Sequence, residues 1–277
     1  MTKKFSLLQI ILYVFLTVFS VIIISPLVIV LSSSLRTPEN MKNPLILFNE
    51  LSFKSYEIAF QKMNFENAFL TSIITTVGSV LVIILIASMV AYPISRIKSK
   101  ISNFLYYFFI AGLIVPSQMV VVPIAQQFGR LNIPSNRFTP MIMFITCSLP
   151  FSVFLYAGFM KSVPIELEEA AYIDGASIWT RFIRIVFPLL QPASVAVAIT
   201  QGMWIWNDYF YPMIFVSERQ QYSLPVAMLQ FLGDKENPAQ WNILFAACVL
   251  TAIPVIIIFA LLQKQFINGI TVGAVKG

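Results

Sequence analysis

The stretch EAAYIDGASIWTRFIRIVFP, residues 169–188, lies between two apolar runs that are each long enough to cross a membrane. The stretch carries charged residues and a glycine, whereas the flanking runs, Thr139–Phe159 and Leu189–Phe210, are mostly apolar. A spanning helix needs about 20 apolar residues in a row. Residues 169–188 are therefore predicted to belong to a loop that joins two membrane-spanning helices.

Three residues in and before this stretch predict its local structure. Pro164 suits the first turn of a helix, where its missing N–H would have no partner in any case. Gly175 suits the left-handed conformation that ends a helix, and Ser177 can cap the start of a second one. We expect a helix over about 164–173, a turn, and a second helix over about 177–184.

The spacing of the stretch follows the pattern E-A-A, three residues, G, nine residues, I, x, L, P, with Phe187 in place of the leucine. The matching residues are Glu169, Ala170, Ala171, Gly175, Ile185 and Pro188. This pattern resembles the EAA loop of permease subunits in binding-protein-dependent, ATP-driven importers. The resemblance implies that the loop docks into a groove of a separate ATPase subunit. It assigns this coupling role to Glu169, Ala170, Ala171, Asp174 and Gly175.

The residues alone leave a second interpretation of the loop open. A short amphipathic helix can simply lie on the membrane face. Against this, the small side chains of Ala170 and Ala171 would let another surface approach the backbone closely, and Glu169 offers a carboxylate to a basic or N–H partner.

Composition places the whole chain in a bilayer. Its residues are 58% hydrophobic and 11% charged, against roughly 25% charged residues in soluble domains. The mean hydropathy is +0.83. Six apolar runs reach spanning length: Leu7–Leu31, Ala68–Ala91, Asn103–Ala125, Thr139–Phe159, Leu189–Phe210 and Asn242–Leu262. The predicted fold class is an all-α, polytopic membrane protein with six transmembrane helices, and the resemblance implies the type I ABC importer permease fold.

Basic residues predict the orientation of these spans. The first run follows Lys3 and Lys4 but is too long for a secretory signal and lacks an A-x-A site, so it is expected to remain as an anchor. Ten of the 18 basic residues flank the side that holds both termini and residues 169–188. The positive-inside rule therefore places both termini and the loop in the cytoplasm. The expected location is the inner or plasma membrane of a prokaryote.

No linker or repeat divides the chain, so residues 1–277 are predicted to form a single transmembrane permease domain. Within it we distinguish a cytoplasmic coupling loop, 161–187, and a C-terminal cytoplasmic tail, 263–277. Mixed helical spacing over 53–63 predicts a short helix on the outer surface, either packing over the bundle or docking a partner. The proline-punctuated segment 211–241 cannot be one continuous helix.

Two further strings resemble the second permease of maltose-type importers. They are WIWNDYFYP at 204–212 and QKQFINGITVGAVKG at 263–277. In that branch the tail reaches into the ATPase dimer, which implies contact roles for residues 273–277, including Gly273 and Lys276. A free tail is the alternative.

The chain shows no means of using ATP or a metal by itself. It lacks the G-x4-G-K-[ST] loop that cradles phosphates, and it contains no histidine. Cys147 and Cys248 lie on separate apolar runs. No catalytic residue, metal site or cofactor is expected, and ATP would be bound by partner subunits. A gradient-driven carrier or channel is less favoured because the spans hold almost no carboxylates.

A polar stripe on the fifth run is a candidate substrate pathway. Thr200, Trp204, Asn207 and Asp208 recur at helical spacing, and an aromatic face with amide and carboxylate groups suits sugar rings and hydroxyls. Interface anchoring by Trp is the alternative. A second stripe is interpreted as helix packing, because Ser and Thr are small interface residues, and the wall of a wet pathway is the alternative. It consists of Ser72, Thr75, Thr76 and Ser79.

Together these features predict a permease subunit that imports a sugar or small oligosaccharide. The expected partners are a second permease subunit, two ATP-binding subunits, an extracytoplasmic solute-binding protein and membrane lipid. The net charge of +6 needs no nucleic acid to explain it, because basic residues that flank spans are topology signals. A permease for glycerol phosphate or a polyamine is the alternative within the same class.

Overall fold

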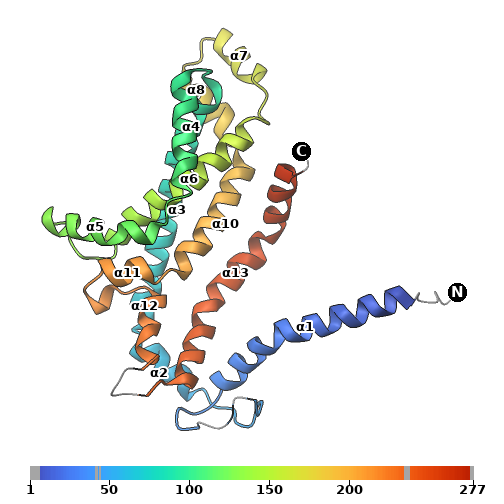
Figure 1. Ribbon diagram of the computed structural model, residues 1–277, viewed down its shortest axis with the longest axis vertical. Helices are drawn as coiled ribbons and strands as arrows, with labels where there is room; N and C mark the ends of the chain where they lie inside the picture. Colours follow the sequence, from blue (N-terminus) through green and yellow to red (C-terminus); the bar gives the residue numbers. More distant parts are fainter. Residues whose placement is uncertain (1–6, 41–42, 44, 234–237, 275–277) are drawn as a thin grey trace. The chain divides into compact units, whose positions relative to one another are not determined.

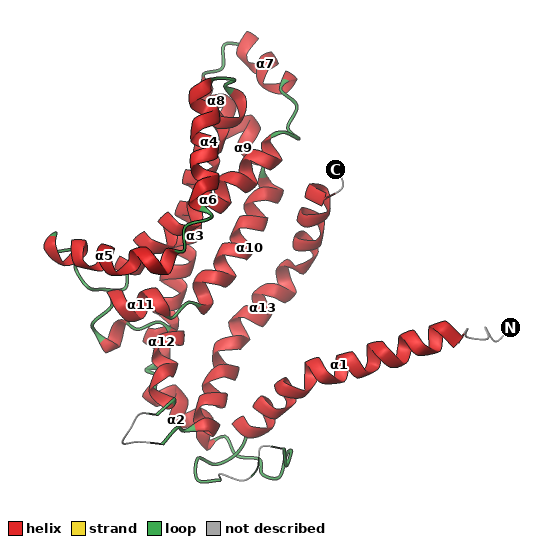
Figure 2. Ribbon diagram, viewed as in Figure 1, coloured by secondary structure: helices red, strands yellow, loops and turns green. Residues whose placement is uncertain are grey.

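A computed structural model describes residues 7–40, 43, 45–233 and 238–274. These residues form helices joined by turns and loops, without strands, which confirms the all-α class (Figure 2). Among the described residues, four helices are long and apolar enough to cross a membrane, and they correspond to the first, second, fourth and sixth predicted runs. They are α1 (Leu7–Ser34), α3 (Phe65–Arg96), α6 (Thr139–Met160) and α13 (Trp241–Ala274) (Figure 1).

The third predicted run, Asn103–Ala125, is not one straight helix. It consists of α4 (Lys100–Gly112) and α5 (Ser117–Arg130), which meet at an angle of 96°. Pro116 explains the break, because a proline ring inside a helix clashes with the carbonyl of the residue four positions earlier, here Gly112. The apolar run was predicted correctly, and the break divides it into two helices.

The fifth predicted run, Leu189–Phe210, contains α10 and belongs to a longer bent segment made of Ile178–Leu189 and Gln191–Asn207. The chain bends by 69° at the single residue between Leu189 and Gln191. In the described part of the chain, the predicted number of six spans is reached only when each bent pair counts as one span. The segment has four parts: α8 (Ile178–Arg181), the π-helix η1 (Phe182–Val186), α9 (Phe187–Leu189) and α10 (Gln191–Asn207). Pro192 lies in the first turn of α10, where a proline is tolerated.

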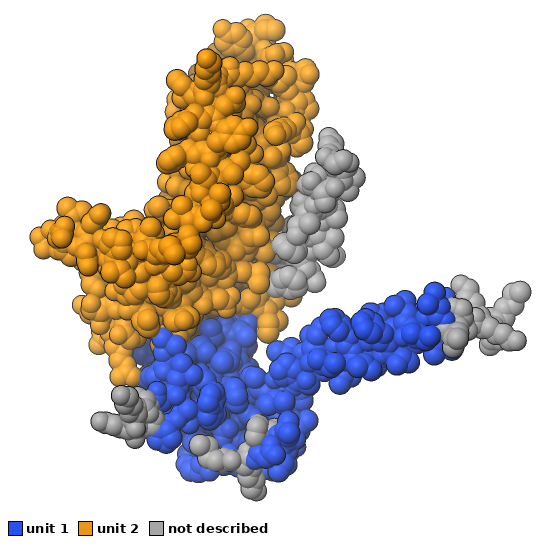
Figure 3. All heavy atoms as spheres, in the orientation of Figure 1, with its two compact units in different colours: residues 1–65, 228–254 blue, residues 66–227, 255–277 orange. Residues whose placement is uncertain are grey.

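The chain divides into two compact units, which Figure 3 distinguishes by colour: residues 1–65 with 228–254, and residues 66–227 with 255–277. The shorter helices of the first unit include α2 (Lys54–Lys62), which confirms the helix predicted over 53–63. The proline-rich segment 211–241 is indeed divided. Its helices are α11 (Phe210–Phe215), η2 (Arg219–Gln221), α12 (Leu224–Met228) and η3 (Leu229–Phe231).

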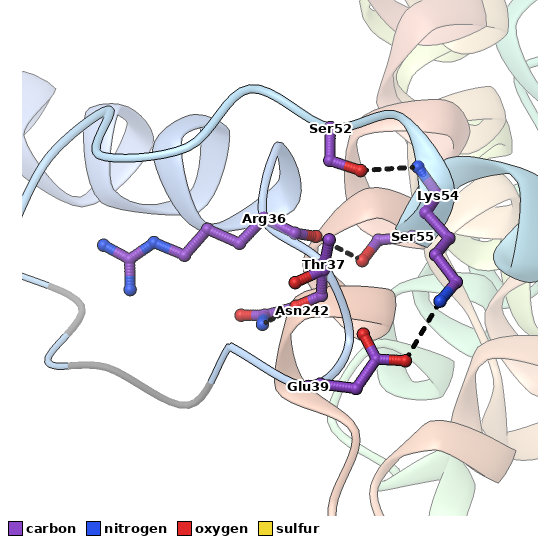
Figure 4. A network of polar contacts seen from close by, with 7 residues as sticks. All are labelled: Arg36, Thr37, Glu39, Ser52, Lys54, Ser55 and Asn242. Atoms are coloured by element: carbon purple, nitrogen blue, oxygen red, sulfur yellow. Dashed lines mark hydrogen bonds and ion pairs between the residues drawn. The ribbon is translucent and has the colours of Figure 1, made fainter.

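A polar network holds the first unit together (Figure 4). The hydroxyl of Ser55 on α2 donates to the carbonyl of Arg36 at 2.6 Å. The Asn242 side chain, at the start of α13, donates to the carbonyl of Thr37 at 2.8 Å. These backbone carbonyls lie in the loop after α1, where no helix supplies hydrogen-bond donors, so side chains from two other helices donate to them instead.

The second unit is built around α3, α6 and α10. Its buried core includes Ile83, Ala91, Tyr156 and Val197, each fully buried or nearly so. Ser72, Thr75 and Ser79 on α3 are also buried, as the packing interpretation of that stripe predicts, whereas Thr76 is half-buried and lines a cavity. The Ser72 hydroxyl accepts a hydrogen bond from the backbone N–H of Leu224 at 2.9 Å.

Candidate functional site

Residues 161–190 form a helix–turn–helix that joins α6 to α10. Its first helix, α7 (Glu166–Ile173), lies at the end of the second unit in Figure 1. It begins two residues later than Pro164, the expected start, and ends where predicted. Three acidic residues occupy its first turn, where the helix dipole favours negative charge.

The turn has the geometry that the sequence predicts. Gly175 has φ +81°, in the left-handed region that glycine adopts without a steric penalty. The N–H of Ala176 donates to the carbonyl of Ala171 at 2.9 Å, which closes the end of α7. The Ser177 hydroxyl accepts a hydrogen bond from the N–H of Thr180 at 3.2 Å and caps α8. Both local predictions are confirmed.

One side of this helix–turn–helix, here called the outward face, is exposed. It carries apolar side chains next to acidic ones, and Ile173 is 84% exposed. Its members are Glu169, Ala170, Tyr172, Ile173, Asp174, Gly175 and Trp179. Ala171 is half-buried beneath it. An exposed apolar patch with a polar rim is typical of a surface that binds another protein.

The opposite side, here called the inward face, centres on Glu168, which is 4% exposed. Its carboxylate accepts hydrogen bonds from the Tyr92 hydroxyl and from Nε of Arg96, both at 2.7 Å. A second guanidinium nitrogen of Arg96 donates to the carbonyl of Val163 at 2.9 Å. The buried carboxylate is thus fully paired, which burial of a charge requires.

Glu168, Arg96 and Tyr92 are absent from the predicted site residues. The available signal was the spacing of Tyr92 and Arg96, four residues apart at the end of the second apolar run, which places a hydroxyl and a cation on one helix face. Their partner lies 72 residues from Arg96 along the chain, so local patterns do not identify it.

The π-helix η1 connects the loop to α10. Its first residue, Phe182, is buried with its ring centroid 5.2 Å from that of Tyr92, so η1 packs beside the inward face. Val186, its last residue, is fully buried. Short π-helical segments are rare in proteins, and those that occur are often found at functional sites.

The predicted pathway residues lie along the second half of α10 and just beyond its end. Thr200 and Asn207 bond to their own helix, through contacts of 2.8 Å to Ala196 and 2.7 Å to Met203. Trp204 is 38% exposed. Asp208 follows the last helical residue and accepts a hydrogen bond from the N–H of Tyr211 at 2.9 Å. The hydrogen bonds of these residues go to other parts of the chain and do not join the four residues to one another.

A cavity of about 270 Å³ in the second unit is lined by residues of α3, α10 and 255–258. Its lining includes Met203 and Trp206 but none of the four predicted pathway residues. Most of its lining is aliphatic, whereas a sugar needs several hydrogen-bonding groups.

The structure describes part of the predicted tail. Helix α13 continues through Gly273 to Ala274, whereas Lys276 lies outside the described residues. Within the described part of the chain, no three His, Cys, Asp or Glu side chains form a group that could hold a metal ion.

Comparison with known proteins supports the motif-based resemblance. Residues 83–272 match the family model described as "Binding-protein-dependent transport system inner membrane component". The chain is 34% identical over 260 residues to the "Probable starch degradation products transport system permease protein AmyC" of Thermoanaerobacterium thermosulfurigenes, covering 94% of each chain. It is 33% identical to the "Melibiose/raffinose/stachyose import permease protein MelC" of Bacillus subtilis, covering 91% of each.

A solved structure has the same fold. A chain from the crystal structure of a bacterial ABC transporter that imports the acidic polysaccharide alginate superposes with a TM-score of 0.81. The match covers 96% of this chain and 100% of that one, at 21% sequence identity. At that identity the likeness shows the fold, and the fold is that of an ABC importer permease.

Proposed function

Since the chain belongs to the family of binding-protein-dependent transport system inner membrane components, we propose that it is the permease subunit of an ATP-driven importer of a sugar or small oligosaccharide. The observation that carries the proposal is the exposed helix–turn–helix with the EAA spacing. The membrane location follows from the family and from the apolar helices.

The substrate class is taken from the relatives. The similar chains are named for starch degradation products and for melibiose, raffinose and stachyose. A third, from Streptococcus mutans, is 32% identical and is named as a multiple sugar-binding transport system permease. Neutral oligosaccharides are therefore proposed as the cargo, ahead of glycerol phosphate or a polyamine.

The outward face is the proposed docking surface for an ATP-binding subunit. Ala170 leaves the backbone accessible, Ile173 and Trp179 supply apolar contact area, and Glu169 supplies a carboxylate. This composition of apolar centre and polar rim suits a protein groove better than a lipid surface. ATP would be bound by two such subunits, so the permease itself would need no cofactor and no ATP site.

The remaining partners are a second permease subunit and an extracytoplasmic solute-binding protein. Both termini and the loop 161–187 would then face the cytoplasm, and the residues around Gly273 and Lys276 would approach the ATPase pair. The stripe of Thr200, Trp204, Asn207 and Asp208 is retained as the proposed substrate pathway, with the aromatic face of Trp204 available to a sugar ring.

The proposed mechanism converts closure of the ATPase subunits into movement of the spans. When these subunits close on ATP, they would move α7 through their contact with its outward face. Because α6 enters the loop and α10 leaves it, the pull would reach both spans directly. A cavity open to the cytoplasm would thereby open to the outside, where the binding protein delivers its sugar.

The test is uptake by the reconstituted complex. Proteoliposomes that contain the permease with its co-purified partners should take up radiolabelled maltotriose or raffinose only with binding protein outside and ATP inside. Glu169→Ala should lower uptake without lowering the amount of permease in the membrane, whereas Glu218→Ala, at an exposed acid outside the loop, is the control. Sugar flux through this chain alone, without an ATPase, would show a gradient-driven carrier instead.

The cargo can be identified separately by calorimetry on the co-purified binding protein. Melibiose, raffinose and maltotriose should release heat at micromolar concentrations. Tight binding of glycerol phosphate or spermidine, with no response to the sugars, would reassign the substrate and leave the architecture unchanged.

A further inference from the structure

The buried contact between α7 and α3 joins two elements that are far apart along the chain. Glu168 on α7 is 4% exposed, and its ion-pair partner Arg96 is the last residue of α3. Both oxygens of the carboxylate are used: one accepts from Arg96 and the other from Tyr92. Hydrogen bonds to an ionised group are short and about twice as strong as neutral ones.

Arg96 also holds the start of the loop. While Nε bonds Glu168, a second guanidinium nitrogen donates to the carbonyl of Val163, which is itself buried. One side chain at the end of α3 therefore contacts the loop both before α7 and within its first turn. A lysine could not reproduce this arrangement, since its single nitrogen cannot span two acceptors in a planar fork.

We propose that Glu168, Arg96 and Tyr92 form a clamp that makes α7 and α3 move as one body when the docking surface is pulled. The inference rests on the proposed function, because it names how that loop transmits force. Glu168 is buried and cannot touch an ATPase, whereas its neighbour Glu169 is exposed. In this proposal Glu168 transmits the movement of α7 to α3, and Glu169 contacts the ATPase subunit.

The clamp links the loop to α3, a span that is not next to the loop in the sequence. The route from α7 to α10 passes through the π-helix and a 69° bend, whereas α3 is held by three hydrogen bonds at 2.7 to 2.9 Å. Toward its other end, α3 carries Ser72, which bonds the backbone of Leu224. A displacement of the loop would therefore reach residue 224 along one continuous helix.

The direct test measures the distance between α7 and α3 in the assembled complex. Spin labels on cysteines that replace Glu166 and Leu85, both exposed, are compared by double electron–electron resonance without nucleotide and with ATP and vanadate. Cys147 and Cys248 are first replaced by alanine. The clamp predicts the same mean distance and width in both states. A shift between the states would overturn it.

Variants give an independent readout. Glu168→Gln should retain the co-purified ATPase but broaden the label distances and lower the stimulation of ATP hydrolysis by binding protein about tenfold, because a neutral amide binds Arg96 more weakly than a carboxylate does. Tyr92→Phe should act in the same direction, and Glu66→Gln, at an exposed acid near the other end of α3, is the matched control. Unchanged distances and stimulation in Glu168→Gln overturn the clamp. Failure of the parent chain to retain any ATPase would instead refute the proposed function. The broadening of the label distances by Glu168→Gln would still be measurable on the permease alone and would test the contact.

Discussion

The two faces of the loop between α6 and α10 differ in almost every physical property, although they share one turn of helix. On the inward face, the Glu168 carboxylate is buried and held by side chains of α3. On the outward face, Glu169 is exposed and is followed by alanines. The comparison teaches that residue type alone does not assign an environment, because one of two adjacent glutamates is buried in an ion pair and the other is exposed.

The largest effect is expected when the inward face loses its cation. Arg96→Leu leaves the Glu168 carboxylate buried without its ion pair, which typically costs about 3 to 5 kcal/mol. The thermal unfolding midpoint of the purified permease should fall sharply. Arg184→Leu, an arginine that is exposed on η1, is the control and should change the midpoint little. Equal shifts in the two variants would mean that the faces do not differ as described.

The turn between the two helices should respond more moderately. Gly175→Ala forces a side chain into the left-handed region, at a cost of about 1 to 2 kcal/mol. No atom lies within 4 Å of the added methyl group, so the cost is one of backbone conformation alone. Gly158→Ala is the matched control, since Gly158 is equally open but helical, and there the change should be neutral or stabilising. Thermal unfolding measures both variants, and uptake should fall only for Gly175→Ala.

The cap of α8 should contribute less. Ser177→Ala removes the acceptor for the Thr180 N–H and should cost about 1 kcal/mol. Ser162→Ala is the comparison, because the Ser162 hydroxyl donates to a carbonyl and caps no amide. Amide hydrogen exchange over residues 178–181 should accelerate in the first variant only; similar exchange in both would show that the cap does not hold α8.

The smallest effect on stability, with a clear effect on binding, is expected on the outward face. Ile173→Ser changes a side chain that is 84% exposed, so the free energy of unfolding should change by less than about 0.5 kcal/mol. Retention of the ATPase subunit in a pull-down should nevertheless fall. Leu131→Ser, which alters a 70% exposed residue in the loop after α5, should leave retention unchanged. Full retention by Ile173→Ser would remove this residue from the docking surface.

Sequence alone predicted the features that depend on neighbouring residues. Gly175 and Ser177 act within one turn, so local rules for caps were sufficient. The long apolar helices were predicted because bilayer thickness sets their length. The spacing at 169–188 indicated the family, and the strings at 204–212 and 263–277 indicated its carbohydrate branch.

Features that depend on distant residues escaped prediction. Hydropathy measures the length of an apolar run and not its direction, so the sequence gives no angle for the 96° turn after Gly112, although Pro116 marks its place. Glu168 was placed correctly on a helix, but its burial depends on Arg96, which no local pattern connects to it. The role of Lys276 and the pathway role of Trp204 remain predictions.

The π-helix at 182–186 fixes the rotational phase of the loop. A π-turn closes one residue later than an α-turn, as the bond from the N–H of Phe187 to the carbonyl of Phe182 shows. Deleting a single residue there would restore regular α-helix and rotate everything before it by about 100° relative to α9, since each residue advances the helix by that angle. Insertions and deletions in this one turn would thus change the direction in which the acidic and apolar side chains of the loop point, without changing the side chains themselves.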